Sequence, residues 1–193
     1  MEVGIFDLET SGFYADSSIL LCCCIKPYHS DKGGQHDKNA IKTIRADKFK
    51  NWGKHKTQER EVIAKIAYEL DQYDILVAHN EERFDKKYFN AKCVQYGITP
   101  VLRLKKVIDP CKLAWNHMKL GRNSLAALID YLQIPVKKTP IELHKWQLAA
   151  LEGDLKAMQT IVTHCEYDVI TLEKVYKKLK SLIDKVDGRG SAF

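Results

Sequence analysis

The chain has 193 residues, of which 45% are hydrophobic and 29% charged, and its net charge at neutral pH is +6. This composition is typical of a soluble globular protein and argues against a disordered or fibrous chain. No run of about 18 apolar residues is present and no signal segment opens the N-terminus, so we expect a cytoplasmic protein that makes no membrane contact.

The positive charge balance is compatible with a polyanionic partner. Basic residues gather at 103–106, at 137–138 and at several lysines between 174 and 180. Nucleic-acid binding and a solvated helix face both produce such clusters, so charge alone leaves the two interpretations open.

Apolar periodicity predicts strands and helices in alternation along the chain. We expect strands at 3–8, 19–26, 74–80 and 101–109, and helices at 58–72, 84–96, from 123 or 124 onward, and from about 154 to 183. Residues 27–55 are polar and predicted to be irregular, with a turn-rich loop at 29–39. This order predicts an α/β fold, with a mixed sheet flanked by helices in one domain of residues 1–185 and a flexible tail at 186–193.

Six cysteines are present, and three of them, Cys22, Cys23 and Cys24, are consecutive in the second predicted strand. Neighbouring residues of a strand point to opposite faces, so these three thiols cannot converge on one metal ion. The other three lie far apart without CxxC spacing. We therefore expect buried, reduced thiols rather than a zinc site.

Two carboxylates, Asp7 and Glu9, interrupt the first predicted strand, VGIFDLETSG. Alternate residues of a strand share one face, so these two side chains project together. Adjacent carboxylates repel each other unless a cation lies between them, and Mg²⁺ and Mn²⁺ prefer oxygen ligands. The pair suggests a metal site, although exposed edge strands also carry such pairs.

Two further positions carry similar chemistry. Asp85 lies at the start of a predicted helix just beyond a buried strand, where sheets of this type build their sites, although the helix dipole also favours an acid there. His164 and Asp168 are four residues apart on the last helix and share one face. Alone, such a His/Asp pair is more often a structural hydrogen bond.

Three motifs occur in this order along the chain: FDLETSG, AHNEERFD and HCEYDV. Together they resemble the three exonuclease motifs of the DEDD superfamily, whose fold is ribonuclease H-like, and the resemblance spans Asp7 to Asp168. Two intervening stretches, VIDPCKLAWNHMKLGRNSLAALIDYLQI and KTPIELHKWQLAALEGD, are similar to the predicted stand-alone exonucleases of that group.

The resemblance implies hydrolysis of nucleic-acid phosphodiester bonds from the 3′ end by means of two divalent metal ions, Mg²⁺ or Mn²⁺. Asp7 and Glu9 fall on the acids of the first motif, Asp85 on the acid of the second and Asp168 on the acid of the third. We expect these four carboxylates to hold the metals, and Glu9 also to contact the 3′ end of the substrate. The expected partner is DNA or RNA with a single-stranded 3′ end, and no protein partner is indicated.

The third motif departs from the pattern of the superfamily, which has either Tyr in Y-x-x-x-D or His in H-x-x-x-x-D. Here the spacing is that of the tyrosine type, but the residue is His164. Tyr167, next to Asp168, points elsewhere on a helix and should not substitute for it. We infer that His164 orients or deprotonates the attacking water.

Five residues are weaker candidates for substrate contacts. Asn80 could bond a phosphate or sugar, Thr10 and Ser11 could offer backbone N–H groups, and Phe13 and Tyr14 could stack on the terminal base. Turn, capping or core-packing roles explain these residues equally well.

Two other classes of function remain as alternatives. A nucleic-acid-binding module could keep the fold without catalysis, and an endonuclease or resolvase could use the same fold and metals. The products of cleavage separate these alternatives from an exonuclease.

Overall fold

The computed structural model describes residues 1–28, 40–55, 57–80, 84–136, 141–142 and 144–183. The expected loop at 29–39 and the expected tail at 186–193 lie outside these residues. The assignment of residues 1–185 to one domain stays a prediction.

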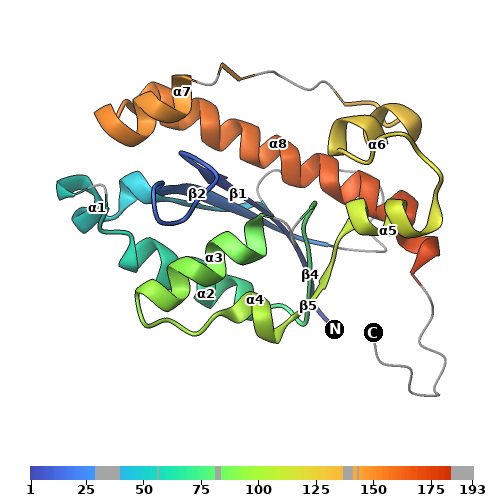
Figure 1. Ribbon diagram of the computed structural model, residues 1–193, viewed down its shortest axis with the longest axis horizontal. Coiled ribbons are helices and arrows are strands. Elements are labelled where there is room, and N and C mark those ends of the chain that lie inside the picture. The colour runs from blue at the N-terminus through green and yellow to red at the C-terminus, as the bar shows by residue number, and fades with distance from the viewer. Residues whose placement is uncertain (29–39, 56, 81–83, 137–140, 143, 184–193) are drawn as a thin grey trace.

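A mixed sheet of five strands forms the centre of the fold (Figure 1). Its strands are β1 (Val3–Thr10), β2 (Leu20–Pro27), β3 (Lys42–Arg45), β4 (Ile75–Val77) and β5 (Lys106–Ile108). The spatial order is β3-β2-β1-β4-β5, in which β1, β4 and β5 are parallel and β2 is antiparallel to both neighbours. The carboxyl ends of β1, β4 and β5 therefore meet at one edge of the sheet, where α/β folds build their sites.

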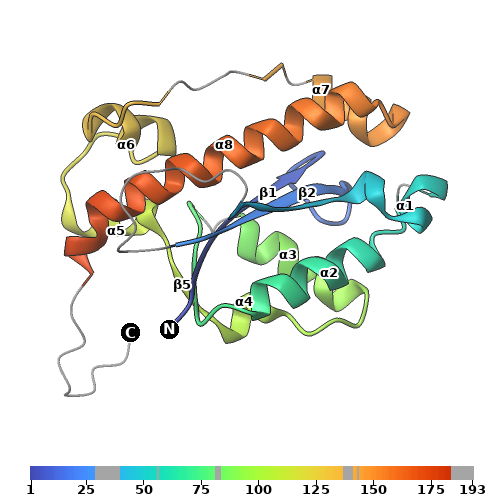
Figure 2. The ribbon, with the colours of Figure 1, turned by 180° about the vertical axis from the view of Figure 1, so that it is seen from behind.

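Helices cover both faces of this sheet (Figures 1 and 2). One layer contains α5 (Pro110–His117), α6 (Leu125–Tyr131), α7 (His144–Gln147) and the long α8 (Leu155–Leu179). The other contains α2 (Arg60–Asp71), α3 (Asp85–Gln95) and α4 (Val101–Leu104), while the short α1 (Lys50–Lys54) follows β3. Short 3-10 turns occupy Ala46–Lys48 and Lys180–Leu182, and a π-helical turn occupies Leu148–Glu152. Among the described residues, no helix has both the length and the apolar character needed to cross a membrane.

The predicted fold class, a mixed sheet flanked by helices, is confirmed. Three predicted strands match β1, β2 and β4, and four predicted helices match α2, α3, α6 and α8 with shifts of a few residues at their ends. The three consecutive cysteines lie on β2 and are fully buried, as expected.

The predicted strand at 101–109 is wrong over its first half. Val101–Leu104 form the short helix α4, and only Lys106–Ile108 form a strand. Val101 and Leu102 are buried where α4 packs against α2 and α3, so tertiary burial overrides the strand preference of the apolar residues.

The prediction that residues 27–55 are irregular is also wrong in part, because β3, a 3-10 turn and α1 lie there. Only Ile44 of β3 is buried, so the strand carries too little apolar pattern to be recognised. Its backbone pairing with β2 creates it. Helices α5 and α7 were likewise not predicted.

Polar side chains fix α8 to the sheet in addition to its apolar face. Lys26 of β2 donates to Glu173 at 2.8 Å, in an ion pair whose side chains are largely buried. Thr43 Oγ1 of β3 donates to Glu166 at 2.8 Å. These bonds set the position of the helix along the strands.

A buried ion pair on the other side of the sheet joins the start of β2 to α2 and α3. Lys92 Nζ of α3 donates to Glu59 Oε2 at 2.5 Å and to the Ser18 carbonyl at 2.7 Å. Glu59 Oε1 accepts the Leu20 N–H at 2.6 Å. Burial raises the pKa of Glu59, while the Leu20 N–H and Lys92 lower it. The pair helps to hold α3, which begins at Asp85.

Replacing Lys92 by Met should cost about 3–5 kcal/mol of folding stability, because the Glu59 carboxylate would remain buried without its cation. The pKa of Glu59 would then rise further. An acid whose pKa is higher in the folded than in the unfolded state stabilises the fold at low pH and less so as the pH rises. Urea unfolding should therefore show a larger loss at about pH 8 than at about pH 5.

The control is Lys65→Met, which removes a half-exposed partner of Glu69 and should cost less than about 1 kcal/mol. The double change Glu59→Gln with Lys92→Met should recover part of the loss. Equal losses for Lys92→Met at the two pH values would contradict this account.

Candidate metal centre

Asp7 and Glu9 lie two residues apart on β1 and therefore project from the same face of the sheet. Helix α8 packs against β1 and β2, and its residues His164 and Asp168 share one side of the helix. One ligand atom from each of Glu9, His164 and Asp168 lies within 4.8 Å of the other two. The fold thus brings together side chains from the two ends of the chain.

Asp7 experiences the charges of all the other motif acids. Burial raises the pKa of Asp7 well above its usual value, and the negative charges of Glu9, Asp85 and Asp168 raise it further. Asp85 is itself buried as the first residue of α3. Carboxylates from three separate segments therefore repel one another in one environment.

The chemistry of these donors fits hard divalent cations. Mg²⁺ and Mn²⁺ prefer carboxylate oxygens, and two such ions would balance the charge of four carboxylates. The nearby thiol of Cys165 contacts Asp7 as well, since its Sγ donates to the Asp7 carbonyl at 3.4 Å. The donor set of the site is therefore rich in oxygen, with one imidazole.

His164 pairs with Asp168 within this group. Its Nε2 lies 3.4 Å from Asp168 Oδ2, and both side chains are 17% exposed. The predicted i, i+4 relation is therefore present as a contact, at the boundary between core and solvent.

Trp146 of α7 is a member of the site that the sequence did not reveal. Its Nε1 donates to Glu9 Oε2 at 2.9 Å, and its ring lies edge-on to His164 with centroids 6.3 Å apart. The indole of α7 thus holds the carboxylate of Glu9, whose backbone belongs to β1. A tryptophan within the polar stretch ELHKWQ was the available signal, but its partner is 137 residues away in the sequence.

Thr10 and Ser11 hold the turn that follows β1. Thr10 Oγ1 donates to the Gly12 carbonyl at 2.7 Å, and Ser11 Oγ accepts the Ile19 N–H at 3.0 Å. The Ser11 N–H donates in turn to the Ile19 carbonyl at 2.9 Å. Thr10 and Ser11 therefore stabilise the turn, which is one of the roles that the sequence left open. The Ser11 N–H is already bonded to the Ile19 carbonyl.

Phe13 and Tyr14 are 82% and 74% exposed, so the alternative that they pack in the core is wrong. The Phe13 ring contacts Phe84, which precedes α3, edge-to-face with centroids 6.1 Å apart. The exposed ring of Phe13 thus packs on the partly buried Phe84, directly before Asp85 at the start of α3.

Asn80 follows β4 in the left-handed backbone region, with φ of +60°. Its N–H donates to Asp109 Oδ1 at 2.8 Å, and the same oxygen accepts the Cys111 N–H at 2.8 Å. Asp109 is thus the N-terminal cap of α5, which begins at Pro110. The Asn80 side chain lines a pocket beside this cap.

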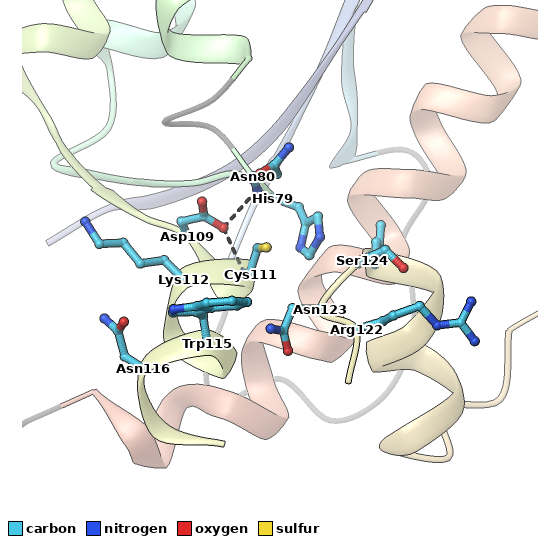
Figure 3. A pocket seen from close by; sticks show the side chains of 11 residues that line it. His79, Asn80, Asp109, Cys111, Lys112, Trp115, Asn116, Arg122, Asn123 and Ser124 are labelled. Carbon is cyan, nitrogen blue, oxygen red and sulfur yellow. Dashed lines mark hydrogen bonds between the residues drawn. The ribbon is translucent and has the colours of Figure 1, made fainter. Parts of the chain in front are cut away.

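That pocket has a volume of about 520 Å³ and lies at the carboxyl ends of β4 and β5 (Figure 3). Its walls combine residues from α5 and from the start of α6 with the ends of the two strands. The lining residues are His79, Asn80, Asp109, Cys111, Lys112, Trp115, Asn116, Arg122, Asn123, Ser124 and Leu125. The sequence did not predict it, because its walls come from three separate segments.

Comparison with known proteins identifies the superfamily to which this fold belongs. No curated protein matches the chain significantly. Among solved structures, the family B DNA polymerase from the hyperthermophilic archaeon Pyrobaculum calidifontis matches with a TM-score of 0.66 at 16% identity, over 93% of this chain and 24% of the polymerase chain. At this identity the likeness shows the fold alone, and the chain spans about a quarter of the polymerase. A family model described as the RNase_H superfamily matches residues 5–180, and the chain therefore belongs to the RNase H superfamily.

Proposed function

We propose that this protein is a 3′–5′ exonuclease of the DEDD type that hydrolyses phosphodiester bonds of nucleic acids with two divalent metal ions. The observation that carries the proposal is the group of Glu9, His164 and Asp168, whose ligand atoms lie within 4.8 Å of one another, beside a buried Asp7 on which the charges of Glu9, Asp85 and Asp168 act. Membership of the RNase H superfamily supports a nuclease, and the fold shared with a DNA polymerase chain supports a nucleic-acid substrate.

Asp7, Glu9, Asp85 and Asp168 are the proposed ligands. When bound, the ions would supply an activated water and balance the charge that develops on the phosphate. The residues around the acids keep them in place for this task. Trp146 holds Glu9 through Oε2, and the Cys165 thiol ties the backbone of Asp7 to α8.

His164 is the proposed acceptor of the proton from the attacking water. It lies beside Asp168 at the edge of the core, and the Trp146 ring limits its movement. A neutral imidazole accepts a proton near neutral pH, which suits this role. Phe13 and Tyr14 would stack on the terminal base, while Thr10 and Ser11 stabilise the turn that carries them.

Asp7→Ala and Asp168→Ala should each lower metal-dependent nuclease activity by at least about a hundredfold. Removing a residue that merely supports a metal ligand lowers metal affinity or activity by about 10–100-fold, and removing a ligand itself should lower activity further. The assay uses 5′-labelled DNA and RNA oligonucleotides with Mg²⁺, Mn²⁺ or EDTA. The wild-type protein should give a ladder shortened one nucleotide at a time from the 3′ end.

Glu152→Ala changes an exposed acid just before α8 and is the matched control, which should cleave like the wild type. Internal cuts would favour an endonuclease, and binding without cleavage in either metal would favour a silent module. Full activity in Asp7→Ala or Asp168→Ala would exclude the proposed ligand set.

Asp7→Asn should stabilise the metal-free protein. Because the pKa of Asp7 is raised in the folded state, its ionisation weakens the fold as the pH rises, and a neutral amide removes that effect. A gain of about 1 kcal/mol corresponds to about 2–4 °C in melting temperature for a chain of this size. The gain should grow between about pH 5 and pH 8.

Adding Mn²⁺ should reverse the order of the two melting temperatures, because the wild type gains more from binding the metal. Asp16→Asn, an exposed acid in the loop after β1, is the control and should change neither value. A lower melting temperature for metal-free Asp7→Asn would show that the acids are not held in mutual repulsion.

His164→Ala should lower kcat by about 10²–10⁴-fold while Mn²⁺ binding, measured by calorimetry, is retained. His144→Ala removes an exposed histidine of α7 and should change neither quantity. Unchanged kcat would make His164 a structural residue. Loss of Mn²⁺ binding would make it a metal ligand instead of a proton acceptor.

A further inference from the structure

The pocket of Figure 3 lies on the same edge of the sheet as the acids. β1 and β4 are parallel and their pairing ends at Ile5 and Val77, and Asp7 and His79 each follow two residues later in the chain. His79 and Asn80 line the pocket. The pocket and the proposed metal ligands therefore lie at the same edge of the sheet.

The walls of the pocket carry cations and an exposed indole. Trp115 and Lys112 project from α5, while Arg122 lies across the pocket just before α6 (Figure 3). Trp115 is 72% exposed, which is a large apolar surface to leave in water. A cation beside an aromatic face, with a second cation on the opposite wall, is a combination with which proteins bind single-stranded nucleic acids.

An amide side chain, Asn123, and the capping carboxylate of α5, Asp109, complete the lining of the pocket. Asn123 is buried in the wall, and its Oδ1 accepts no hydrogen bond from the described residues. Asp109 is the acid of the lining, and one of its oxygens is held by two backbone N–H groups as the cap of α5. The volume of about 520 Å³ lies in the usual range for a ligand of nucleotide size.

A smaller hollow of about 200 Å³ continues beyond this pocket. It shares Asp109, Lys112 and Asn116 with the first pocket and extends along β5 to Lys106. Lys112 thus lines both hollows, and a second lysine, Lys106, lines the smaller one.

We propose that the pocket lined by Trp115, Lys112 and Arg122, named here the upstream pocket, binds the substrate strand on the 5′ side of the scissile bond. This inference rests on the proposed function, since it assigns the pocket to the same strand. Trp115 stacks on a base, and Lys112 and Arg122 contact phosphates. The 3′-terminal base lies toward Phe13, which contacts Phe84 ahead of α3, whereas the upstream pocket is bounded by α5 and α6.

The test measures binding without catalysis. Fluorescence anisotropy follows 5′-labelled oligothymidylates of two and eight nucleotides in EDTA, where metal-dependent cleavage does not occur. Trp115→Ala should weaken binding of the eight-nucleotide strand at least about fivefold, since stacking on an aromatic side chain contributes this much or more. Trp115→Phe should retain most of the affinity, and the dinucleotide should be much less affected.

A salt titration tests the cations separately. Lys112→Ala should lower the slope of log affinity against log salt by about 0.7, the value for one lost phosphate contact on a single strand. Tyr68→Ala removes an aromatic side chain of α2 that is 61% exposed and is the matched control, expected to change neither affinity nor slope. Melting temperatures verify that each variant is folded.

The outcomes separate this proposal from the exonuclease proposal. Unchanged affinity and slope in Trp115→Ala and Lys112→Ala would overturn the upstream pocket, even if the wild type degrades strands from the 3′ end. Equal losses for two and eight nucleotides would also overturn it, because the pocket would then be a mononucleotide site. Trp115-dependent binding of the longer strand in a protein that cleaves nothing would support the pocket while the exonuclease proposal fails.

Discussion

The packing of α8 across β1 and β2 is the constraint on which the candidate site depends. The carboxylates of β1 and α8 repel each other, so their own interaction opposes this packing. Apolar burial on the inner face of α8 supplies the opposing free energy, through the fully or almost fully buried side chains of Ile161, Val162, Cys165, Val169 and Leu172. The thiol of Cys165 adds a bond to the Asp7 carbonyl, which sets the helix against the strand beside Asp168. The core therefore holds together charges that would otherwise separate.

This arrangement concentrates unfavourable electrostatic free energy around Asp7. Burial raises the pKa of Asp7 and the neighbouring acids raise it further, whereas two other largely buried acids among the described residues are paired with lysines. Lys92 neutralises Glu59, and Lys26 neutralises Glu173. Asp7, Glu9, Asp85 and Asp168 thus share one environment beside well-paired buried ions, and a divalent metal would balance the charge of these four acids. Such local conflicts between burial and charge are expected at functional sites, since selection for stability alone would remove them.

The sequence predicted those parts of the candidate site whose relative positions follow from the local period of a strand or a helix. Asp7 and Glu9 follow the two-residue period of a strand, and His164 and Asp168 follow the i, i+4 relation of a helix, so each pair could be assigned to one face. The roles of these residues remain predictions. Trp146 could not be assigned, because its contact with Glu9 depends on how α7 packs after the chain has crossed the whole domain. The helical turn at Val101–Leu104 was missed for a related reason, since burial against α2 and α3 decided its conformation.

The cap of α5 links the geometry of the sheet edge to the upstream pocket. Asp109 Oδ1 accepts N–H groups from Asn80 at the end of β4 and from Cys111 in the first turn of α5. A single carboxylate oxygen therefore fixes where β4 ends relative to where α5 begins, and α5 presents Lys112 and Trp115 one to two turns later. Because β4 pairs with β1, the same bond also ties α5 to the part of the sheet that carries Asp7 and Glu9. Asp109 thus connects the part of the sheet that carries the acids to the helix that presents the proposed contacts of the upstream pocket.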